Sequence, residues 1–177
     1  MDICKVCRNS KPYLFLKSEG LVYWGCNTCG AKFLDPKNYV SSNYEKKHYL
    51  KHNNSTTDIN YKNFLLKLIE PMKGKISTND IGLDYGCGFA PALADILKSR
   101  GFKVELYDPF FFPNKDVLLN KYKFITCSEV VEHFFNPCEE FDKINNLLEN
   151  NAWFGVMTTI LTKDEMFENW YYRRDPT

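Results

Sequence analysis

The sequence predicts an α/β protein whose main part is a doubly wound, mostly parallel sheet. Segments with strand and helix character alternate between residues 79 and 159, and a glycine-rich turn joins the first strand to the first helix. Two cysteine pairs set the first thirty residues apart as a separate small module. Of the 177 residues, 44% are hydrophobic and 16% are aromatic, which is enough for a packed core.

Residues 1–35 contain two CxxC pairs, CKVC and CNTC, with eighteen residues between them. Strands are expected at Tyr13–Leu16 and Leu21–Trp24, joined through Ser18-Glu19-Gly20, and each cysteine pair is expected on a tight turn. Paired turns at this spacing present four thiolates to one Zn²⁺, and four protein ligands leave no open position for catalysis. The sequence therefore predicts a structural zinc ribbon, the alternative being four unligated thiols. The expected metal ligands are Cys4, Cys7, Cys26 and Cys29.

Residues 36–75 form a polar helical linker rich in asparagine, lysine, histidine and tyrosine. One helix is expected over Tyr44–Lys51, and a second, amphipathic helix starts at Asp58 or Asn60 and stops near Gly74. The linker either folds over a bound ligand as a lid or is a solvated connector. The side chains expected to form such a lid are Tyr44, Tyr49, His52 and Asn53.

Residues 76–177 are expected to form the α/β domain. The predicted strands are Ile81–Asp84, Phe102–Tyr107, Phe124–Cys127 and Trp153–Thr159. The predicted helices are Pro91–Arg100, Glu129–Phe135 and Glu139–Glu149. In a sheet built this way, ligands bind at the edge formed by the carboxyl ends of the strands.

The turn after the first strand has the features of a nucleotide-type site. Gly86 and Gly88 let the backbone approach a ligand closely. A dinucleotide is disfavoured, because Pro91 replaces the third glycine of GxGxxG and Asp84 would repel a pyrophosphate. A carboxylate beside the turn instead suits the ammonium group of S-adenosylmethionine (SAM). Asp108, at the end of the second strand, is placed to accept hydrogen bonds from ribose hydroxyls.

Four segments of the α/β domain carry motifs: LDYGCGFAPAL, ELYDPFF, ITCSEVVEHFFNP and LLENNAWFGVM. In that order they resemble motif I, the acidic second motif, the fourth-motif segment and the following helix-to-strand passage of class I SAM-dependent methyltransferases. Ala90 stands where motif I usually has its third glycine. With the CxxC head, the YLKHNN linker and the NWYYRRDPT segment, nearly the whole chain resembles bacterial methyltransferase-domain proteins that carry a zinc-ribbon head.

The resemblance implies a Rossmann-like fold and methyl transfer from SAM to an O, N or C nucleophile of an unnamed acceptor: a small molecule, RNA or protein. Glu132 and His133 are the catalytic candidates, because a histidine near the strand end can accept a proton from the nucleophile. The alternative is that both residues brace the structure. The α/β domain of residues 76–177 is thus expected to bind SAM. The cofactor-binding residues implied are Asp84, Gly86, Cys87, Gly88, Ala90, Asp108, Pro109, Cys127, Ser128 and Glu129.

A second interpretation of the chain is a non-catalytic zinc-ribbon and Rossmann-like module that docks RNA or protein. Residues 1–75 hold 13 Lys and Arg against 6 Asp and Glu, whereas the rest holds 10 against 16. The excess of Lys and Arg in residues 1–75 either contacts an acidic partner or simply keeps exposed helices solvated. No apolar run approaches the roughly 20 residues of a membrane span, and no signal peptide opens the chain, so a cytoplasmic location without membrane partners is expected.

Proteins of the type resembled usually continue beyond DPT with closing strands, so the C-terminal end is expected to be truncated and one sheet edge open. That edge is expected either to pair with a second copy of the chain or to be covered by residues 161–177. The large amphipathic side chains of Trp170, Tyr171 and Tyr172 suit either arrangement, and Trp170 is then expected to be substantially buried.

Overall fold

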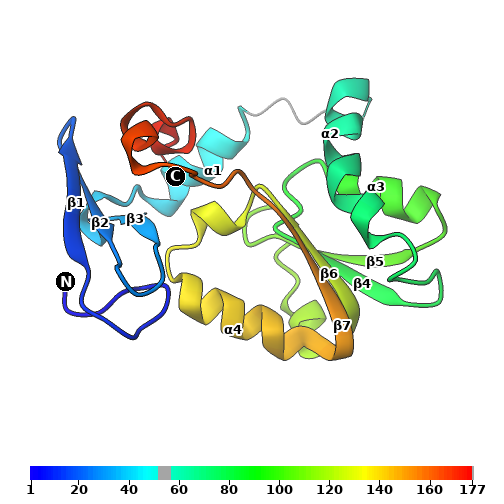
Figure 1. Ribbon diagram of the computed structural model, residues 1–177. Coiled ribbons are helices and arrows are strands. Elements are labelled where there is room, and N and C mark those ends of the chain that lie inside the picture. Colours follow the sequence, from blue (N-terminus) through cyan, green and yellow to red (C-terminus); the bar gives the residue numbers. More distant parts are fainter. Residues whose placement is uncertain (52–56, 177) are drawn as a thin grey trace. The chain divides into compact units, whose positions relative to one another are not determined.

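The computed structural model describes residues 1–51 and 57–176 (Figure 1). The chain divides into two compact units, each described below by itself. The head unit comprises Met1–Lys47, His133–Asp142 and Ile160–Thr177, and the sheet unit comprises His48–Glu132 and Lys143–Thr159. No helix in the described ranges is long and apolar enough to cross a membrane.

The head unit contains a three-stranded antiparallel sheet in the order β1-β2-β3. Its strands are β1 (Tyr13–Ser18), β2 (Leu21–Gly25) and β3 (Lys32–Leu34). Glu19 and Gly20 have φ values of 52° and 80°, the left-handed backbone that a two-residue hairpin loop requires. The two predicted strands are confirmed. β3 was not predicted, because three residues held by pairing with β2 leave no periodic signal.

The C-terminal segment belongs to the head unit. It contains two 3₁₀ turns, Asp164–Asn169 and Tyr172–Arg174. The buried ring of Phe167 contacts Phe15 and Tyr23 edge-on, with ring centroids 5.1 Å and 5.0 Å apart. The segment therefore packs on the antiparallel sheet of the head, and covering of the parallel sheet's open edge by this segment stays a prediction. Trp170 is only partly buried, and pairing of the open edge with a second copy stays a prediction.

The sheet unit is built on four parallel strands in the order β5-β4-β6-β7, which confirms the predicted α/β class. These strands are β4 (Ile81–Tyr85), β5 (Lys103–Tyr107), β6 (Tyr122–Ser128) and β7 (Leu148–Met157). The chain leaves β4 toward β5 on one side, while β6 lies on the other. The topological switch point, where such sheets bind ligands, is therefore at the carboxyl ends of β4 and its neighbours.

Helices α2 (Ile59–Ile69) and α3 (Ala92–Ser99) supply the core on the sheet. Asp58 caps α2 by accepting a hydrogen bond from the backbone N–H of Asn60 at 2.8 Å. A Cβ atom at Gly155 would lie 2.7 Å from Sδ of Met72, so this glycine lets the end of the α2 region approach β7. The buried cluster comprises Leu65, Leu68, Ile69, Met72, Ala92, Leu93, Ala94, Leu97, Val104 and Phe124.

Two predicted elements differ from the structure. The helix predicted over Glu129–Phe135 is only a 3₁₀ turn, Val131–His133. Glu129 has a left-handed φ of 54° and donates its N–H to the carbonyl of Met157, a backbone conformation that cannot begin an α-helix. Helix α4 spans Pro137–Leu147, two residues earlier at each end than predicted, with proline at its first position.

Linker helix α1 spans Ser42–Tyr49, close to the predicted range. Two of the residues expected in a lid, His52 and Asn53, lie outside the described residues. Between β5 and β6 the chain forms a 3₁₀ helix, Lys115–Leu119.

Candidate functional site

The four head cysteines are drawn together by the turns before β1 and after β2. Their Sγ atoms all lie within 4.8 Å of one another, with 3.8 Å between Cys4 and Cys29 and 3.7 Å between Cys7 and Cys26. A tetrahedral site with Zn–S bonds of about 2.3 Å has S–S edges of about 3.8 Å. The cluster thus has the size and ligand chemistry of a structural zinc site.

Both cysteine turns have the same backbone geometry, as expected from the repeated CxxC pattern. The N–H of Arg8 donates to the carbonyl of Cys4 at 3.1 Å, and the N–H of Gly30 donates to that of Cys26 at 2.8 Å. Arg8 and Gly30 both have left-handed φ values, 53° and 75°. The prediction of two tight turns is confirmed.

The protonation preferences of the thiols differ across the cluster. The hydroxyl of Ser10, 3.1 Å from Sγ of Cys26, together with the backbone of Cys29, lowers the pKa of Cys26 to about 6. Burial raises the pKa of Cys29 to about 12 and also raises that of Cys4. A bound divalent cation would favour the thiolate form of all four residues, because its charge is the largest in such a site.

The glycine turn after β4 is anchored to the end of β5. The N–H groups of Gly86 and Cys87 both donate to the carbonyl of Tyr107, at 2.8 Å and 3.2 Å. Gly86 (φ 79°) and Gly88 (φ 66°) adopt the left-handed backbone that favours glycine. A Cβ at Gly86 would lie 2.5 Å from Cγ1 of Val130, whereas a Cβ at Gly88 would meet nothing within 4 Å. Gly88 therefore borders open space.

Asp108 links the glycine turn to the loop after β5. Its Oδ2 accepts a hydrogen bond from the N–H of Gly88 at 3.1 Å, and its Oδ1 accepts from Phe110 and Phe111 at 2.8 Å and 3.0 Å. Its backbone pairs with that of Phe112. An ionised carboxylate accepts about four hydrogen bonds, so one acceptor position remains beside the turn. Pro109 is exposed and Ala90 partly buried.

Asp84 lies inside the sheet unit. Only 3% of it is exposed, its Oδ1 accepts a 2.9 Å hydrogen bond from the hydroxyl of Thr126, and it also accepts one from the N–H of Ala94. Burial raises the pKa of Asp84 to about 7, although these hydrogen bonds and Lys98 act in the opposite direction. Burial, and then the charges of Asp84 and Asp108, raise the pKa of Cys87, so this residue is a neutral thiol at neutral pH.

The wild-type protein is expected to become less stable as the pH rises, because Asp84 must then ionise while buried. Asp84→Asn is expected to abolish this loss. The pKa of Asp84 is about 7 in the folded state, whereas an unfolded aspartate has a pKa near 3.9. Between about pH 4 and 7 the folded state therefore binds one more proton than the unfolded state, so the free energy of unfolding falls as the pH rises through this range. Asparagine has no charge to bury. Urea unfolding should give a variant more stable than wild type by a few kcal/mol at pH 8 and about equal at pH 4. The exposed Asp95→Asn is the control, and parallel wild-type and Asp84→Asn curves would contradict the expectation.

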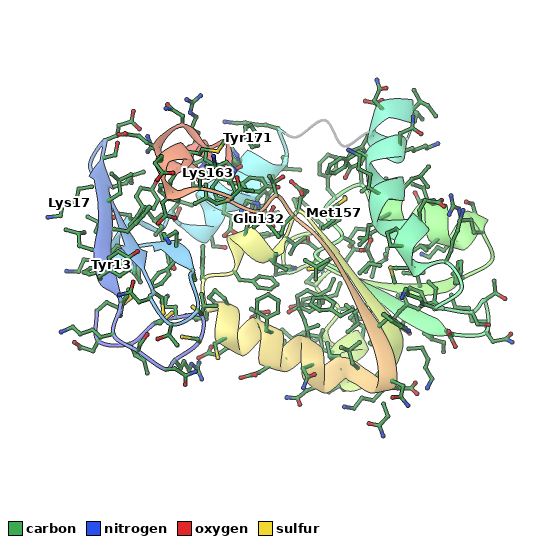
Figure 2. The ribbon with its side chains drawn as sticks, viewed as in Figure 1. Tyr13, Lys17, Glu132, Met157, Lys163 and Tyr171 are labelled. Atoms are coloured by element: carbon green, nitrogen blue, oxygen red, sulfur yellow. The ribbon has the colours of Figure 1, made fainter. Side chains whose placement is uncertain are left out.

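The segment that follows β6 brings further predicted residues to the same edge. Cys127 is fully buried and pairs with Val156 of β7, and Ser128 ends the strand partly exposed. Glu132 follows beyond the end of β6, and both its carboxylate oxygens are buried (Figure 2). His133 is partly buried and belongs to the head unit, whereas Glu132 belongs to the sheet unit.

Aromatic side chains from three segments lie next to one another beside the glycine turn. Phe110 contacts Tyr49 at the end of the linker helix, with 6.0 Å between ring centroids, and Phe111 contacts Phe89 of the turn at 5.8 Å. One residue of the predicted lid, Tyr49, thus lies against the loop that follows β5. Another, Tyr44, is exposed and belongs to the head unit.

Two residues of this site were missed in the sequence. Tyr61 on α2 packs against the core beside Phe64, and burial, followed by the charges of Asp84 and Glu129, raises its pKa. Its spacing from Phe64 and Leu65 marked the inward face of the helix and was the available signal. Thr126 gave no signal, because its role depends on β6 lying beside β4.

A groove of about 470 Å³ lies between the α2 region and β7 within the sheet unit. Lys75 is one of two lysines that line it, and its Nζ lies 4.1 Å from the ring centroid of Trp153. Glu129, Met157 and Thr159 also line the groove, so it reaches the carboxyl edge of the sheet. Met157 marks the end of β7 at this edge (Figure 2).

Comparison with protein-family models matches residues 57–177, more than half of the chain, to a methyltransferase domain. Comparison with curated proteins found no match. The matched range contains the glycine turn, Asp84, Asp108 and Glu132, and it does not include the cysteine cluster.

Proposed function

This chain belongs to the methyltransferase-domain family, and we propose that it takes its methyl group from SAM. The transfer goes to an O, N or C nucleophile of an acceptor and leaves S-adenosylhomocysteine. The observation that carries this proposal is the joining of Gly88 to Asp108 across the ends of two adjacent parallel strands, with open space beside the glycine. A backbone free of side chains and a carboxylate at this position suit a nucleoside.

The residues present fit the parts of SAM. The remaining acceptor position of Asp108 suits a ribose hydroxyl. Asp84 is buried below the turn, and its charge, when it is ionised, would favour the ammonium group from there. The backbone of Cys127, Ser128 and Glu129 would line the methionine portion. The aromatic side chains beside the turn offer ring faces that favour a cation such as the sulfonium.

When bound, SAM supplies an electrophilic methyl carbon. The main task of this chain is then to hold donor and acceptor in line, because methyl transfer depends strongly on orientation. Glu132 and His133 follow β6, and His133 is the proposed acceptor of the proton that an oxygen or nitrogen nucleophile loses. The four cysteines would hold Zn²⁺ as a structural ion, since no ligand position is left for chemistry.

The proposal is tested by calorimetry with SAM and S-adenosylhomocysteine, followed by transfer of labelled methyl from SAM with cell extract as acceptor. Binding of both compounds and labelling of an extract component are expected. Absence of SAM binding by zinc-loaded, folded protein would contradict the proposal and favour the non-catalytic docking module.

Asp108→Asn is expected to weaken SAM binding by about 10-fold to 150-fold, the loss of a charge-assisted hydrogen bond of about 1.5–3 kcal/mol. The asparagine carbonyl still accepts from Phe110 and Phe111, so the loop after β5 is kept, whereas its NH2 group cannot accept from the N–H of Gly88, so that bond of the turn is lost as well. The exposed Asp116→Asn carries the same change in charge and should bind SAM as wild type does. Calorimetry showing unchanged affinity for Asp108→Asn would mean that SAM does not use the carboxylate of Asp108.

A further inference from the structure

Lys5 lies between two of the cysteines in the first CxxC turn, and its side chain is bound to a distant part of the sequence. Its ammonium group donates to the carbonyl of Phe135 at 2.8 Å, to Oδ1 of Asn136 at 3.2 Å and to the hydroxyl of Tyr39 at 3.4 Å. An ammonium group has three donors, and here three acceptors meet it. This is a built binding arrangement rather than a solvated surface lysine.

Neighbouring contacts hold the same two segments together. The ring of Tyr39 stacks on Phe135 with 4.6 Å between centroids and 14° between planes. Nζ of Lys5 lies 4.9 Å from the centroid of Tyr39, within reach of a cation–π interaction. The carbonyl of Lys5 accepts from the N–H of Cys138 at 3.3 Å, and Arg8 pairs with Glu139 at 2.8 Å.

All these contacts lie within the head unit, and they hold the segment of residues 133–142. Residues 133–142 follow directly on Glu132, begin with His133 and contain the first turn of α4. The Lys5 backbone is fixed on both sides by Cys4 and Cys7, two members of the metal cluster. The contacts of Lys5 therefore join the first cysteine turn to the segment that begins with His133, one of the two proposed catalytic residues.

We propose that Lys5 is a positioning residue that couples the metal-bound first cysteine turn to residues 133–142 and so fixes His133, the first of these residues, for methyl transfer. The coupling itself rests on the contacts above, and its catalytic consequence rests on the proposed function. Metal binding would then support catalysis through the conformation of this segment, without the metal touching substrate.

The test is hydrogen exchange by mass spectrometry on the full zinc-loaded chain. Lys5→Met should speed exchange in the peptide covering 133–142 by about tenfold or more, while α3 and β4 keep their protection. Zinc content should stay at one ion per chain. Lys11→Met, an exposed lysine of the same unit, is the matched control and should leave exchange unchanged. Tyr39→Leu removes the stacked ring while keeping Lys5 and should also speed exchange, which covers the case in which Lys5→Met fails to fold.

A second measurement separates positioning from cofactor binding. Lys5→Met should lower the rate of labelled methyl transfer to cell extract by about tenfold and leave the Kd for SAM within about twofold of wild type. Unchanged exchange in 133–142 in both zinc-loaded variants would overturn the coupling. Faster exchange with an unchanged transfer rate would overturn the catalytic role. If the wild-type protein neither binds SAM nor transfers methyl, the proposed function fails, and the exchange measurement still decides the coupling.

Discussion

Cys26→Ser is expected to lower bound zinc from one ion per chain to a small fraction and to unfold the antiparallel sheet of the head unit. Structural zinc sites contribute about 10–16 kcal/mol of binding free energy, which becomes folding free energy when no site exists in the unfolded chain. Three short strands supply little core to replace it. Cys26 is buried, and the hydroxyl of Ser10 and the backbone of Cys29 lower its pKa to about 6, so a serine there removes a ligand that readily forms the thiolate.

The measurement is elemental analysis of protein purified without chelator, together with the near-ultraviolet circular dichroism of the head aromatics. Cys138→Ser is the matched control, because Cys138 belongs to the same unit but not to the cluster. It should retain one zinc ion. Equal zinc content in wild type and Cys26→Ser would show that the four thiols do not act together as a metal site.

Gly88→Ala is expected to weaken SAM binding by about 10-fold to 200-fold, the effect of one methyl group in a fitted pocket. The added Cβ would enter the open space beside the turn, which the proposed function assigns to the cofactor. The left-handed backbone costs alanine about 1–2 kcal/mol as well, so folding stability must be measured alongside affinity.

Gly74→Ala separates these two effects. Gly74 has a φ of 74° against 66° for Gly88, and a Cβ there also meets nothing within 4 Å. The two variants should lose similar stability in urea unfolding, and only Gly88→Ala should lose SAM affinity by calorimetry. Equal affinities for SAM in both variants would show that the space beside Gly88 does not hold the cofactor.

Local sequence signals determined much of this protein. The repeated CxxC spacing predicted the cysteine cluster, since each pair forms its turn from contacts within a few residues. The alternation of apolar segments predicted the parallel strands and α2 and α3, because periodicity reports which face of an element is buried. The glycines and the acidic strand ends predicted which residues line the carboxyl edge, since in such a sheet these ends meet at one edge.

Long-range packing decided the rest. The hydrogen bond between Asp84 and Thr126 exists because β6 lies beside β4, and strand order cannot be obtained from periodicity. The left-handed Glu129 replaced a predicted helix because its N–H is held by the end of β7. Lys5 lies inside the first CxxC motif, but the motif does not indicate what its side chain binds, and only its three acceptors across the head unit show this. A sequence records each residue's own preferences, whereas these contacts depend on which distant residues folding brings together.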